Sequence, residues 1–505
     1  MRFQNIAHYI ANRFTILIFY SINANIKKSI LQGDDVMIQS HEKYKCYPSV
    51  ICVGKETEIT LFPCDLSRRF RDNRDYELTI KGSNEDEIDY HCSIPFSQSF
   101  TLKDGCLHFT CTLKSEQEYI VHFREKGEQA IKIPIYAVEE DLYKLRPLKG
   151  DLHTHSYYSD GIDGIPTVPA DYREHGFDFF ALTDHNRMFP SVLAAELYDG
   201  IPLGINIIRG EEVHTPDSQL HIVHVGGNES VCEKYIHHND EFENAVEKIE
   251  ATMAYVPEHY RHRVAMAKWA CNEIHKAGGI AIFAHPYWRP RNYNITKEFD
   301  DLLFDEKMFD AFEVMGGTGS DANNKQVALW QEQLIKGNRI PVVGSSDSHN
   351  HDFDKDVFGH CFTYVFAKSN RTEDILDAIR KGYCVSGELP KNNEDEPRFY
   401  STNLRFVLFA HFLYHNYFKE THRLCFGEGV LMHRYAEGEP VGDILASLAD
   451  TIESFYRKFY GVTPAPVIPK DRHEFMDKCL YMQQHIGPTT KGSSISFYGS
   501  NARYE

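Results

Sequence analysis

The sequence lacks any apolar run long enough to cross a bilayer. Its 505 residues contain no stretch of about 18 consecutive apolar side chains, so no transmembrane helix is predicted. The C-x-x-C motif is also absent, although 12 cysteines are present. A zinc ribbon and a redox-active dithiol are therefore not predicted. We expect reduced, buried thiols.

Positive charge is scarce. Lys and Arg total 54 against 73 Asp and Glu, which gives a formal net charge of -19. Proteins that bind DNA or RNA through the phosphate backbone need a basic surface, so no nucleic-acid partner is expected. The apolar fraction of 42% is sufficient for packed cores, and the length predicts about three domains.

Residues 1–43 are interpreted as an N-terminal extension. Their apolar run, residues 14–20, is similar to a weak signal peptide, but no A-x-A cleavage site follows it. A start codon misplaced upstream of Met37 is the alternative explanation. We expect a cytoplasmic protein, and the sequence leaves secretion through this segment open.

Residues 44–140 alternate apolar and polar side chains over short segments separated by turn residues, which predicts a β-sandwich with an accessory role. The clearest segments are 58–62, 76–80, 107–111, 119–123 and 131–135. Residues 391–505 open with an acidic stretch and continue with helical patterns, so an α-helical C-terminal tail is predicted.

Residues 148–390 alternate helical patterns with short apolar runs, which predicts a parallel α/β domain. Seven runs are interpreted as buried strands: 148–153, 177–184, 205–211, 219–225, 279–285, 311–315 and 340–346. If these strands close into a barrel, their carboxyl ends meet at one mouth, where barrel enzymes have their active sites.

Most of the 27 histidines lie between residues 151 and 360, and several stand at the ends of these strands together with Asp and Glu. In His153-Thr154-His155 both imidazoles project from the same side of an extended chain. A mixed set of nitrogen and oxygen ligands suits Zn, Mn or Fe. A carboxylate such as Glu212 can bridge two such ions, and paired ions can generate a hydroxide.

Five segments carry these residues: 150–161 (GDLHTHSYYSDG), 182–185 (LTDH), 210–213 (GEEV), 283–286 (FAHP) and 346–349 (SDSH). Together with the closing segment 363–382, they resemble the motifs of the PHP family, the polymerase and histidinol phosphatase superfamily. The β-rich region ahead of them is similar to the CehA/McbA-type metallohydrolase branch. The resemblance implies a distorted (β/α)7 barrel that holds two or three divalent ions, Mn, Zn or Fe.

The resemblance also implies which residues bind the ions: His153, His155, Asp160, His185, Glu212, His221, His285, Asp347 and His349. On the fourth strand His224 is the alternative to His221. Glu212, Asp347 and His285 are the expected catalytic residues, and Arg289 is expected to bind an anionic substrate group. Glu211 is expected to pack outside the centre, and Asp184 to orient a ligand histidine.

These residues predict a metal-dependent hydrolase, preferably a phosphoesterase that uses a hydroxide bridging the ions to attack a small phosphorylated substrate. Because a hydroxide does not select its electrophile, hydrolysis of a carboxyl ester, an amide or a carbamate is the alternative within the enzyme class. A non-catalytic PHP-type binding module is the alternative outside it.

Overall fold

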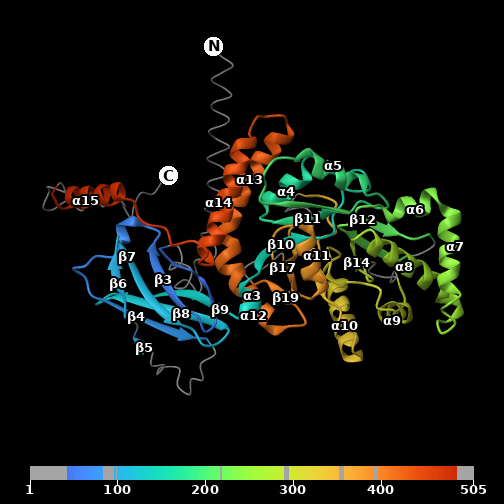
Figure 1. Cartoon of the computed structure of the whole chain (residues 1–505), viewed down its shortest axis with the longest axis horizontal. Coiled ribbons are helices and arrows are strands. Elements are labelled where there is room, and N and C mark those ends of the chain that lie inside the picture. Colours follow the sequence, from blue (N-terminus) through green and yellow to red (C-terminus); the bar gives the residue numbers. More distant parts are fainter. Residues whose placement is uncertain are drawn as a thin grey trace, which may run out of the picture.

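A computed structural model describes residues 43–83, 96–97, 99–216, 219–288, 295–351, 358–390 and 396–485. The predicted extension therefore lies outside the described residues, apart from residue 43. The described chain forms a β-sandwich, a large barrel-like α/β unit and a group of C-terminal helices (Figure 1). No described helix has both the length and the apolar character that crossing a membrane requires.

The N-terminal region is a sandwich of two sheets, as the alternating pattern predicts. The first sheet has the order β1-β3-β7-β6 and the second the order β2-β9-β8-β4-β5. All five predicted segments lie within strands. The strands are β1 (Tyr44–Tyr47), β2 (Val50–Cys52), β3 (Glu56–Pro63), β4 (Tyr76–Gly82), β5 (Phe96–Ser97), β6 (Thr101–Lys103), β7 (Cys106–Thr112), β8 (Gln117–Glu125) and β9 (Ile131–Val138).

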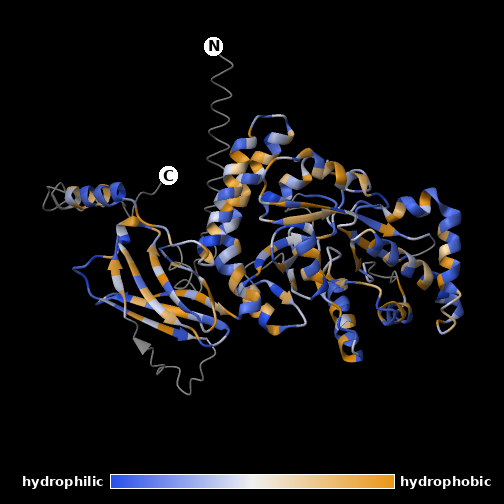
Figure 2. Cartoon of the chain, viewed as in Figure 1, coloured by the Kyte–Doolittle hydropathy of each residue, from blue (hydrophilic) through white to orange (hydrophobic). Residues whose placement is uncertain are grey.

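The core of the sandwich follows from the period of two. Along β8 every second side chain is buried, because successive side chains of a strand point to opposite faces. Tyr119, Val121 and Phe123 therefore face the opposite sheet and pack on residues such as Ile59 and Leu107. Figure 2 shows the resulting alternation of hydrophobic and hydrophilic residues along these strands.

The α/β unit is built on one sheet of ten strands in the order β16-β15-β14-β13-β12-β11-β10-β17-β18-β19. The seven predicted strands are all present; β15 has its predicted limits, and the other six differ from theirs in length or position. The strands are β10 (Arg146–Asp151), β11 (Phe179–Leu182), β12 (Asn206–His214), β13 (His221–Val225), β14 (Ile280–Phe283), β15 (Ala311–Met315), β16 (Val342–Gly344), β17 (Cys361–Ala367), β18 (Cys384–Glu388) and β19 (Arg398–Tyr400).

The expectation of a wholly parallel sheet is wrong. Strand β13 runs antiparallel to both β12 and β14, and β17 runs antiparallel to β10. The reason for β13 is the link from β12, residues 215–220, which is too short to carry the crossover helix that a parallel pair needs. The sheet also continues to Tyr400, within the region predicted to be helical.

The sheet nearly closes into a barrel. At the seam, the Thr363 hydroxyl on β17 accepts a hydrogen bond from the Gly344 amide (2.9 Å) and donates one to the Gly344 carbonyl (2.8 Å). Beyond the strand ends, the Asp347 amide donates to the His153 carbonyl and the His155 amide to the Ser348 carbonyl, each at 2.9 Å. These bonds fix the loops after β10 and β16 against each other.

Helices cover the outside of the barrel, and apolar side chains such as Ala181, Val223 and Ile282 fill its interior.

Helix α10 ends at Gly337, whose φ of 94° lies in the left-handed region that glycine adopts without strain. The helices are α4 (Val168–Glu174), α5 (Phe189–Leu197), α6 (Val231–His237), α7 (Asn239–Glu250), α8 (Glu258–Lys276), α9 (Lys297–Asp305), α10 (Ser320–Lys336) and α11 (Thr372–Arg380).

The C-terminal helices do not form a peripheral tail. They are α12 (Leu404–Leu413), a π-helical turn η2 (Tyr414–Phe418), α13 (Lys419–Ala436), α14 (Gly442–Phe459) and α15 (Lys470–His485). Figure 1 shows α13 and α14 between the sandwich and the barrel. Phe409 and Phe412 contact Tyr136 of the sandwich at ring-centroid distances of 5.0 and 5.2 Å. Helices α12 to α14 therefore share one buried core with both neighbours, whereas α15 lies at the outer edge of the sandwich (Figure 1).

Candidate metal centre

The mouth of the barrel gathers the predicted ligands. Eight of the nine fall in groups of His, Asp and Glu whose ligand atoms lie within 4.8 Å of one another: His153, His155, Asp160, His185, Glu212, His221, His285 and His349. The ninth is Asp347, and its Oδ1 atom lies 3.0 Å from Nε2 of His155. Arg289, the predicted substrate-binding cation, lies outside the described residues.

All of these side chains except Asp160, which lies in the loop after β10, stand at the strand end that faces the mouth. His153 and His155 follow β10, His185 follows β11, and Glu212 lies near the end of β12. His285 follows β14. Asp347 and His349 follow β16. The sheet therefore brings together residues that are almost two hundred positions apart in the sequence.

Glu212 is the centre of the cluster. Its side chain is fully buried, and Oε1 lies 2.7 Å from His221 Nδ1 and 3.3 Å from His285 Nε2. Its other oxygen, Oε2, lies 2.6 Å from His185 Nδ1 and 3.4 Å from Nε2 of both His153 and His155. The two oxygens of one carboxylate thus face two separate sets of imidazoles.

Asp347 supplies a second carboxylate beside Glu212. Its Oδ1 lies 3.3 Å from His153 Nε2, and its Oδ2 lies 3.7 Å from His285 Nε2. Asp347 and His285 have φ values of 49° and 22°, in the left-handed region that side chains other than glycine rarely adopt. Strained backbone of this kind concentrates at functional sites, and here it lies at the two strand ends that direct these side chains inward.

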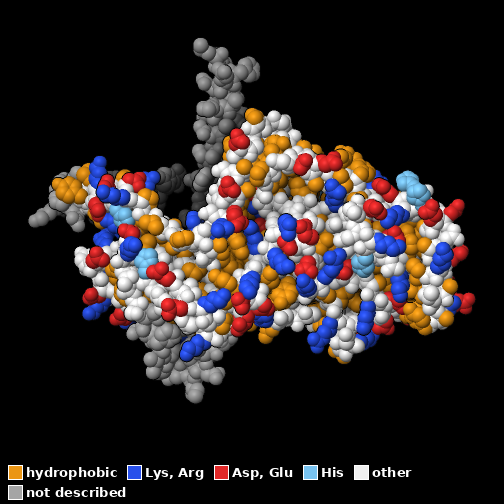
Figure 3. All heavy atoms as spheres, viewed as in Figure 1, with side chains coloured by type: hydrophobic (Ala, Val, Ile, Leu, Met, Phe, Trp, Pro, Cys, Tyr) orange, Lys and Arg blue, Asp and Glu red, His pale blue; other side chains and the backbone are white. Residues whose placement is uncertain are grey.

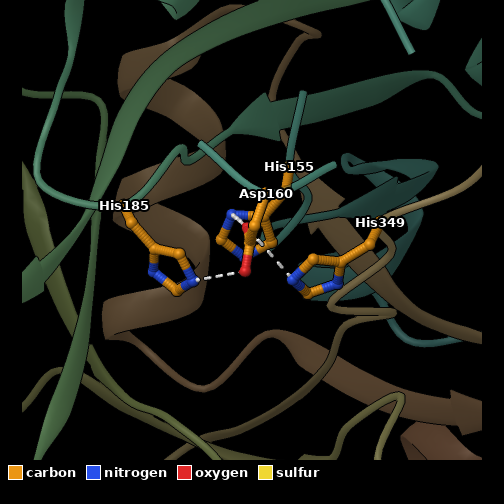
Figure 4. Close-up of side chains that lie close together, drawn as sticks. All are labelled: His155, Asp160, His185 and His349. Atoms are coloured by element: carbon orange, nitrogen blue, oxygen red, sulfur yellow. Dashed lines mark ion pairs between the residues drawn. The ribbon is translucent and has the colours of Figure 1, made fainter. Parts of the chain in front are cut away.

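Asp160 closes the outer side of the cluster. Figure 4 shows its carboxylate between His185 and His349, with His155 next to it. Asp160 Oδ2 lies 3.3 Å from His185 Nε2, and Oδ1 lies 3.3 Å from His349 Nε2. About half of the Asp160 side chain, 52%, is exposed, whereas His153 and His155 are fully buried. The cluster is therefore open to solvent at this end and closed at the other.

Further hydrogen bonds hold the loop that carries the H-x-H pair. Asp184 accepts hydrogen bonds from the Ser156 amide (2.9 Å), the Ser156 hydroxyl (2.7 Å) and the Ser159 hydroxyl (2.6 Å). The Ser159 hydroxyl lies 3.3 Å from His155 Nδ1. Asp184 thus contacts a predicted ligand only through Ser159, which agrees with an orienting role for this carboxylate.

The charge balance of the cluster depends on its burial. Burial lowers the pKa of His221 to about 4 despite the adjacent Glu212, and it also lowers the pKa of His155. Although burial opposes ionisation of Asp347, the surrounding histidines, His153 first, hold its pKa below the usual range.

Four other imidazoles shift the opposite way: although burial opposes their protonation, neighbouring carboxylates raise the pKa of His185 to about 10 and also raise the pKa of His153, His285 and His349. Imidazoles bind metal ions in the neutral form, so metal binding would release protons from these four.

Unsatisfied polar atoms in the cluster fit a bound cation. Nε2 of His153, Nε2 of His285, Nε2 of His214 and Oε2 of Glu212 are buried and form no hydrogen bond within the described structure. Buried polar atoms without partners cost about 1–3 kcal/mol each, so they are rare in folded proteins. Divalent ions coordinated by these atoms would remove that cost, and nitrogen and carboxylate ligands are the kinds that Zn, Mn and Fe accept.

The structure distinguishes the two histidines on β13. His221 lies in the mouth beside Glu212, whereas His224 Nδ1 lies 3.0 Å from Glu211 Oε1, away from the cluster. Glu211 also accepts hydrogen bonds from the Val231 amide and the Ser230 hydroxyl, each at 2.6 Å. Glu211 and His224 therefore brace the start of α6, as expected for a glutamate that packs outside the centre.

Two further residues belong to the cluster and are not in the predicted ligand set, although Glu313 is among the strand residues expected to face the mouth. Glu313 on β15 lies with Oε2 2.9 Å from His153 Nδ1, and His214 Nε2 lies 3.6 Å from Glu212 Oε2. The sequence carries a signal for both. Glu313 lies in the sixth predicted strand, and His214 follows Glu212 at the spacing of two that puts side chains on one face of a strand.

Comparisons with known proteins agree with this geometry. Residues 151–329 match the sequence model of the PHP domain family. The protein named DNA polymerase/3'-5' exonuclease PolX of Bacillus subtilis (strain 168) is 33% identical over 85 residues, which cover 15% of this chain and 14% of that protein. The chain thus matches only a small part of this relative.

The matches to solved structures are distant. A two-domain protein containing a predicted PHP-like metal-dependent phosphoesterase from Bacteroides vulgatus ATCC 8482 is 22% identical, with a TM-score of 0.34 over 48% of this chain and 65% of that one. A putative metal-dependent phosphoesterase from Bifidobacterium adolescentis ATCC 15703 is 19% identical, with a TM-score of 0.28 over 40% and 87% of the two chains.

The family match begins at Asp151, just before the H-x-H pair, and continues past Glu313 on β15. It therefore includes the strands β11 to β15 and most of the residues that meet in the mouth. The chain contains a PHP domain.

Proposed function

We propose that the chain is a metal-dependent hydrolase that cleaves phosphate esters of small molecules. The observation that carries the proposal is the position of Glu212. Both of its oxygens are buried, and they face histidines that come from β10, β11, β13 and β14. A carboxylate in such surroundings suits two cations better than one, because each oxygen has its own set of nitrogen ligands.

In this proposal the ions are held by three overlapping sets of side chains around Glu212 and Asp347. The first set contains His153, His155 and Glu212, and the second contains Glu212, His221 and His285. The third contains His155, Asp160, His185 and His349. Three such sets support two or three divalent ions. Bound ions would supply a Lewis acid for the substrate oxygen and would activate a water molecule.

The remaining steps fall to side chains of the chain itself. Asp347, next to Glu212, is the group we assign to accept the proton of the attacking water. His285 is 3% exposed and lies within 3.7 Å of both carboxylates, so it would hold them in place and exclude solvent. His349 is 36% exposed at the open end, where solvent water can reach and protonate the leaving group.

The substrate class is tested on purified full-length protein. We would measure bound metals first, and then hydrolysis of phosphate monoesters, phosphate diesters, carboxyl esters, carbamates and amides with the metal found. A single-stranded oligonucleotide belongs in the panel, because the curated relative is named an exonuclease. We expect two or three metal equivalents and the highest kcat/KM on a small phosphate ester.

Glu212→Gln and Glu211→Gln form a matched pair for this test. Both glutamates are fully buried neighbours on β12, but only Glu212 faces the mouth. We expect Glu212→Gln to reduce kcat/KM by about 100-fold or more with loss of metal, since even indirect partners of ligands contribute about 10–100-fold. We expect Glu211→Gln to retain both. Equal loss in the two variants, or hydrolysis that does not depend on bound metal, would contradict the proposal.

A further inference from the structure

A second cavity lies in the β-sandwich, apart from the barrel mouth. It has a volume of about 650 Å³ and is lined by the turn η1 (Leu66–Arg68), the start of β4, and the β8–β9 hairpin at residues 123–131. This volume lies in the range of roughly 300–1,000 Å³ that small-molecule sites occupy. Nothing in the proposed hydrolysis uses this cavity, so the inference below is independent of that function.

The lining of this cavity is mainly cationic, although the chain as a whole is acidic. Its cationic residues are Lys43, Arg68, Arg69, Arg71, Arg74 and Arg124, and its acidic residues are Glu125 and Glu128. The whole chain has the opposite balance, with 54 basic and 73 acidic residues. Figure 3 shows Lys and Arg interspersed with Asp and Glu over the visible face of the molecule. The excess of cationic residues in the lining of the cavity is therefore a local feature.

Several of these cations are balanced within the chain. Arg124 lies 2.6 Å from Glu77, Arg74 pairs with Glu125, and Arg69 pairs with Asp477 on α15. Arg68 is only 3.6 Å from Asp65, at positions that are about half exposed.

Two of the cations have no such balance. Lys43 and the Arg71 guanidinium form no ion pair with any residue in the described ranges. Like charges gathered without counterions repel one another, so this arrangement favours an anion in the cavity.

The base of the cavity is aromatic and fixed. Tyr44 and Phe123 are 7% and 3% exposed, and their ring centroids are 4.8 Å apart. The Tyr44 hydroxyl donates to the Arg68 carbonyl (3.0 Å), and the Arg71 amide donates to the Tyr76 hydroxyl (3.3 Å). The backbone that carries the arginines is therefore anchored to the sandwich core, which reduces the entropy that a ligand must overcome on binding.

We propose that this cavity binds a small molecule that carries two or more anionic oxygen groups, with a planar or apolar part against the aromatic base. A guanidinium group presents parallel N–H donors that match a phosphate, sulfonate or carboxylate group. Several cations around one cavity select multiply charged ligands over singly charged ones. The aromatic base contributes contact area at no electrostatic cost.

Naphthalene-1,3,6-trisulfonate is the first probe, because it is fluorescent, multiply charged and not a substrate for hydrolysis. Benzene-1,3,5-tricarboxylate is the second and tests carboxylate in place of sulfonate. Both are titrated into the full chain by fluorescence or calorimetry. We expect saturable binding of at least one of them at one site per chain. Binding of only one probe identifies which oxygen group the cavity prefers.

Variants then locate the site. The double variant Lys43→Ala/Arg71→Ala should weaken binding by about tenfold or more, because each removed charge-assisted contact contributes on the order of a tenfold change in Kd. Arg71→Lys keeps the charge but loses the bidentate N–H donor of the guanidinium group. Its Kd should therefore lie between those of the natural chain and the double variant. Arg434→Ala on α13 removes one exposed cation elsewhere and should leave binding unchanged.

Metal content and hydrolysis should also stay unchanged in the cavity variants, since these residues lie in the sandwich. Absence of saturable binding by both probes would overturn the proposal. An equal loss of affinity in Arg434→Ala and in the double variant would overturn it as well, because the binding would then follow net charge alone.

Discussion

Glu428 on α13 and Glu212 on β12 are both fully buried, yet their surroundings differ. Glu428 Oε2 accepts a hydrogen bond from Arg173 Nε at 2.6 Å, and Oε1 accepts one from the Gly204 amide at 2.6 Å. Arg173 also donates to the Phe177 carbonyl at 2.7 Å. The negative charge of Glu428 is therefore balanced inside the protein by a permanent cation.

Glu212 has no permanent cation beside it within the described structure. Its neighbours are imidazoles, and burial favours the neutral form of His221 and His155. One of its oxygens, Oε2, forms no hydrogen bond. The difference indicates that the charge of Glu428 is balanced in the folded chain and serves stability, whereas the charge of Glu212 calls for ions from outside and serves chemistry.

Asp300 on α9 shows a third arrangement. It is fully buried, and its Oδ2 accepts a hydrogen bond from the Tyr287 hydroxyl at 2.8 Å, while Oδ1 has no partner in the described structure. Burial raises the pKa of Asp300 to about 7. With neither a buried cation nor a metal-type cluster around it, this carboxyl group is neutralised by a proton.

The largest expected effect comes from breaking the pair on α13. Glu428→Gln leaves the Arg173 guanidinium buried with less compensation, so we expect the free energy of unfolding to fall by about 3–5 kcal/mol. Metal content should be unchanged in protein that remains folded. Thermal and denaturant unfolding with parallel metal analysis measure both. Glu437→Gln, an exposed position next to the end of the same helix, is the control and should change stability very little.

A fall in metal content of folded Glu428→Gln protein, without loss of stability, would contradict the distinction between the two carboxylates. It would mean that α13 acts on the mouth of the barrel rather than on the packing of the helices against it.

Removal of metal ions tests whether the cluster around Glu212 depends on bound ions. Ions that bind only the folded state at about 100 times their Kd stabilise it by about 2.7 kcal/mol, so dialysis against a chelator should lower Tm, and returning the ions should restore it. In Glu212→Gln this chelator-dependent shift should be much smaller, because two of the three ligand sets contain Glu212. In Glu428→Gln it should be retained, because the cluster in the mouth is intact. An undiminished shift in Glu212→Gln would show that the ions bind elsewhere.

The comparison also explains how far the sequence could predict the centre. Strand ends predicted that His, Asp and Glu side chains would meet at one mouth, and the resemblance to the PHP motifs implied the nine that do. Strand ends do not give strand direction. His221 and His224 were both candidates because the direction of β13 was unknown. The antiparallel course of β13 puts its first residue, His221, at the mouth and pairs His224 with Glu211.

Other features depend on packing that the sequence does not encode locally. Glu313 reaches the centre because the sheet nearly closes into a barrel, so that β15 faces the end of β10 that carries His153. The C-terminal helices have amphipathic patterns that predict helices but not their neighbours. They pack against α4 through a shared apolar core and through contacts such as Arg173 with Glu428, which are more than 250 residues apart in the sequence.

Glu313 allows a finer test of how the mouth is organised. Its carboxylate contacts His153 Nδ1, whereas His153 Nε2 faces Glu212 and Asp347. A carboxylate behind a ligand histidine fixes the ring and raises its basicity, and loss of such a partner costs about 10–100-fold in metal affinity. We therefore expect Glu313→Gln to weaken metal binding by that amount, measured by competition with a chelating dye.

Glu211→Gln is again the control for Glu313→Gln, since Glu211 contacts a histidine that lies outside the mouth. If Glu211→Gln weakened metal binding as much as Glu313→Gln, the effect would come from general loosening of the barrel and not from the contact with His153.

The smallest expected effect concerns the proton on Asp300. Its pKa is raised from 3.8 to about 7 in the folded protein, so between these values the folded state holds a proton that the unfolded state has released. The stabilisation that protonated Asp300 gives to the folded state is therefore present at low pH and is lost as the pH rises through 7. Asp300→Asn removes the titration, so the stability of the variant relative to the natural chain should rise by about 1 kcal/mol between pH 6 and pH 7. Urea unfolding at several pH values measures this difference. Asp305→Asn, at an exposed position on the same helix, should show no such trend. A relative stability of Asp300→Asn that does not change with pH would mean that Asp300 is ionised in the folded protein, and the third arrangement would then need a cation, as the other two do.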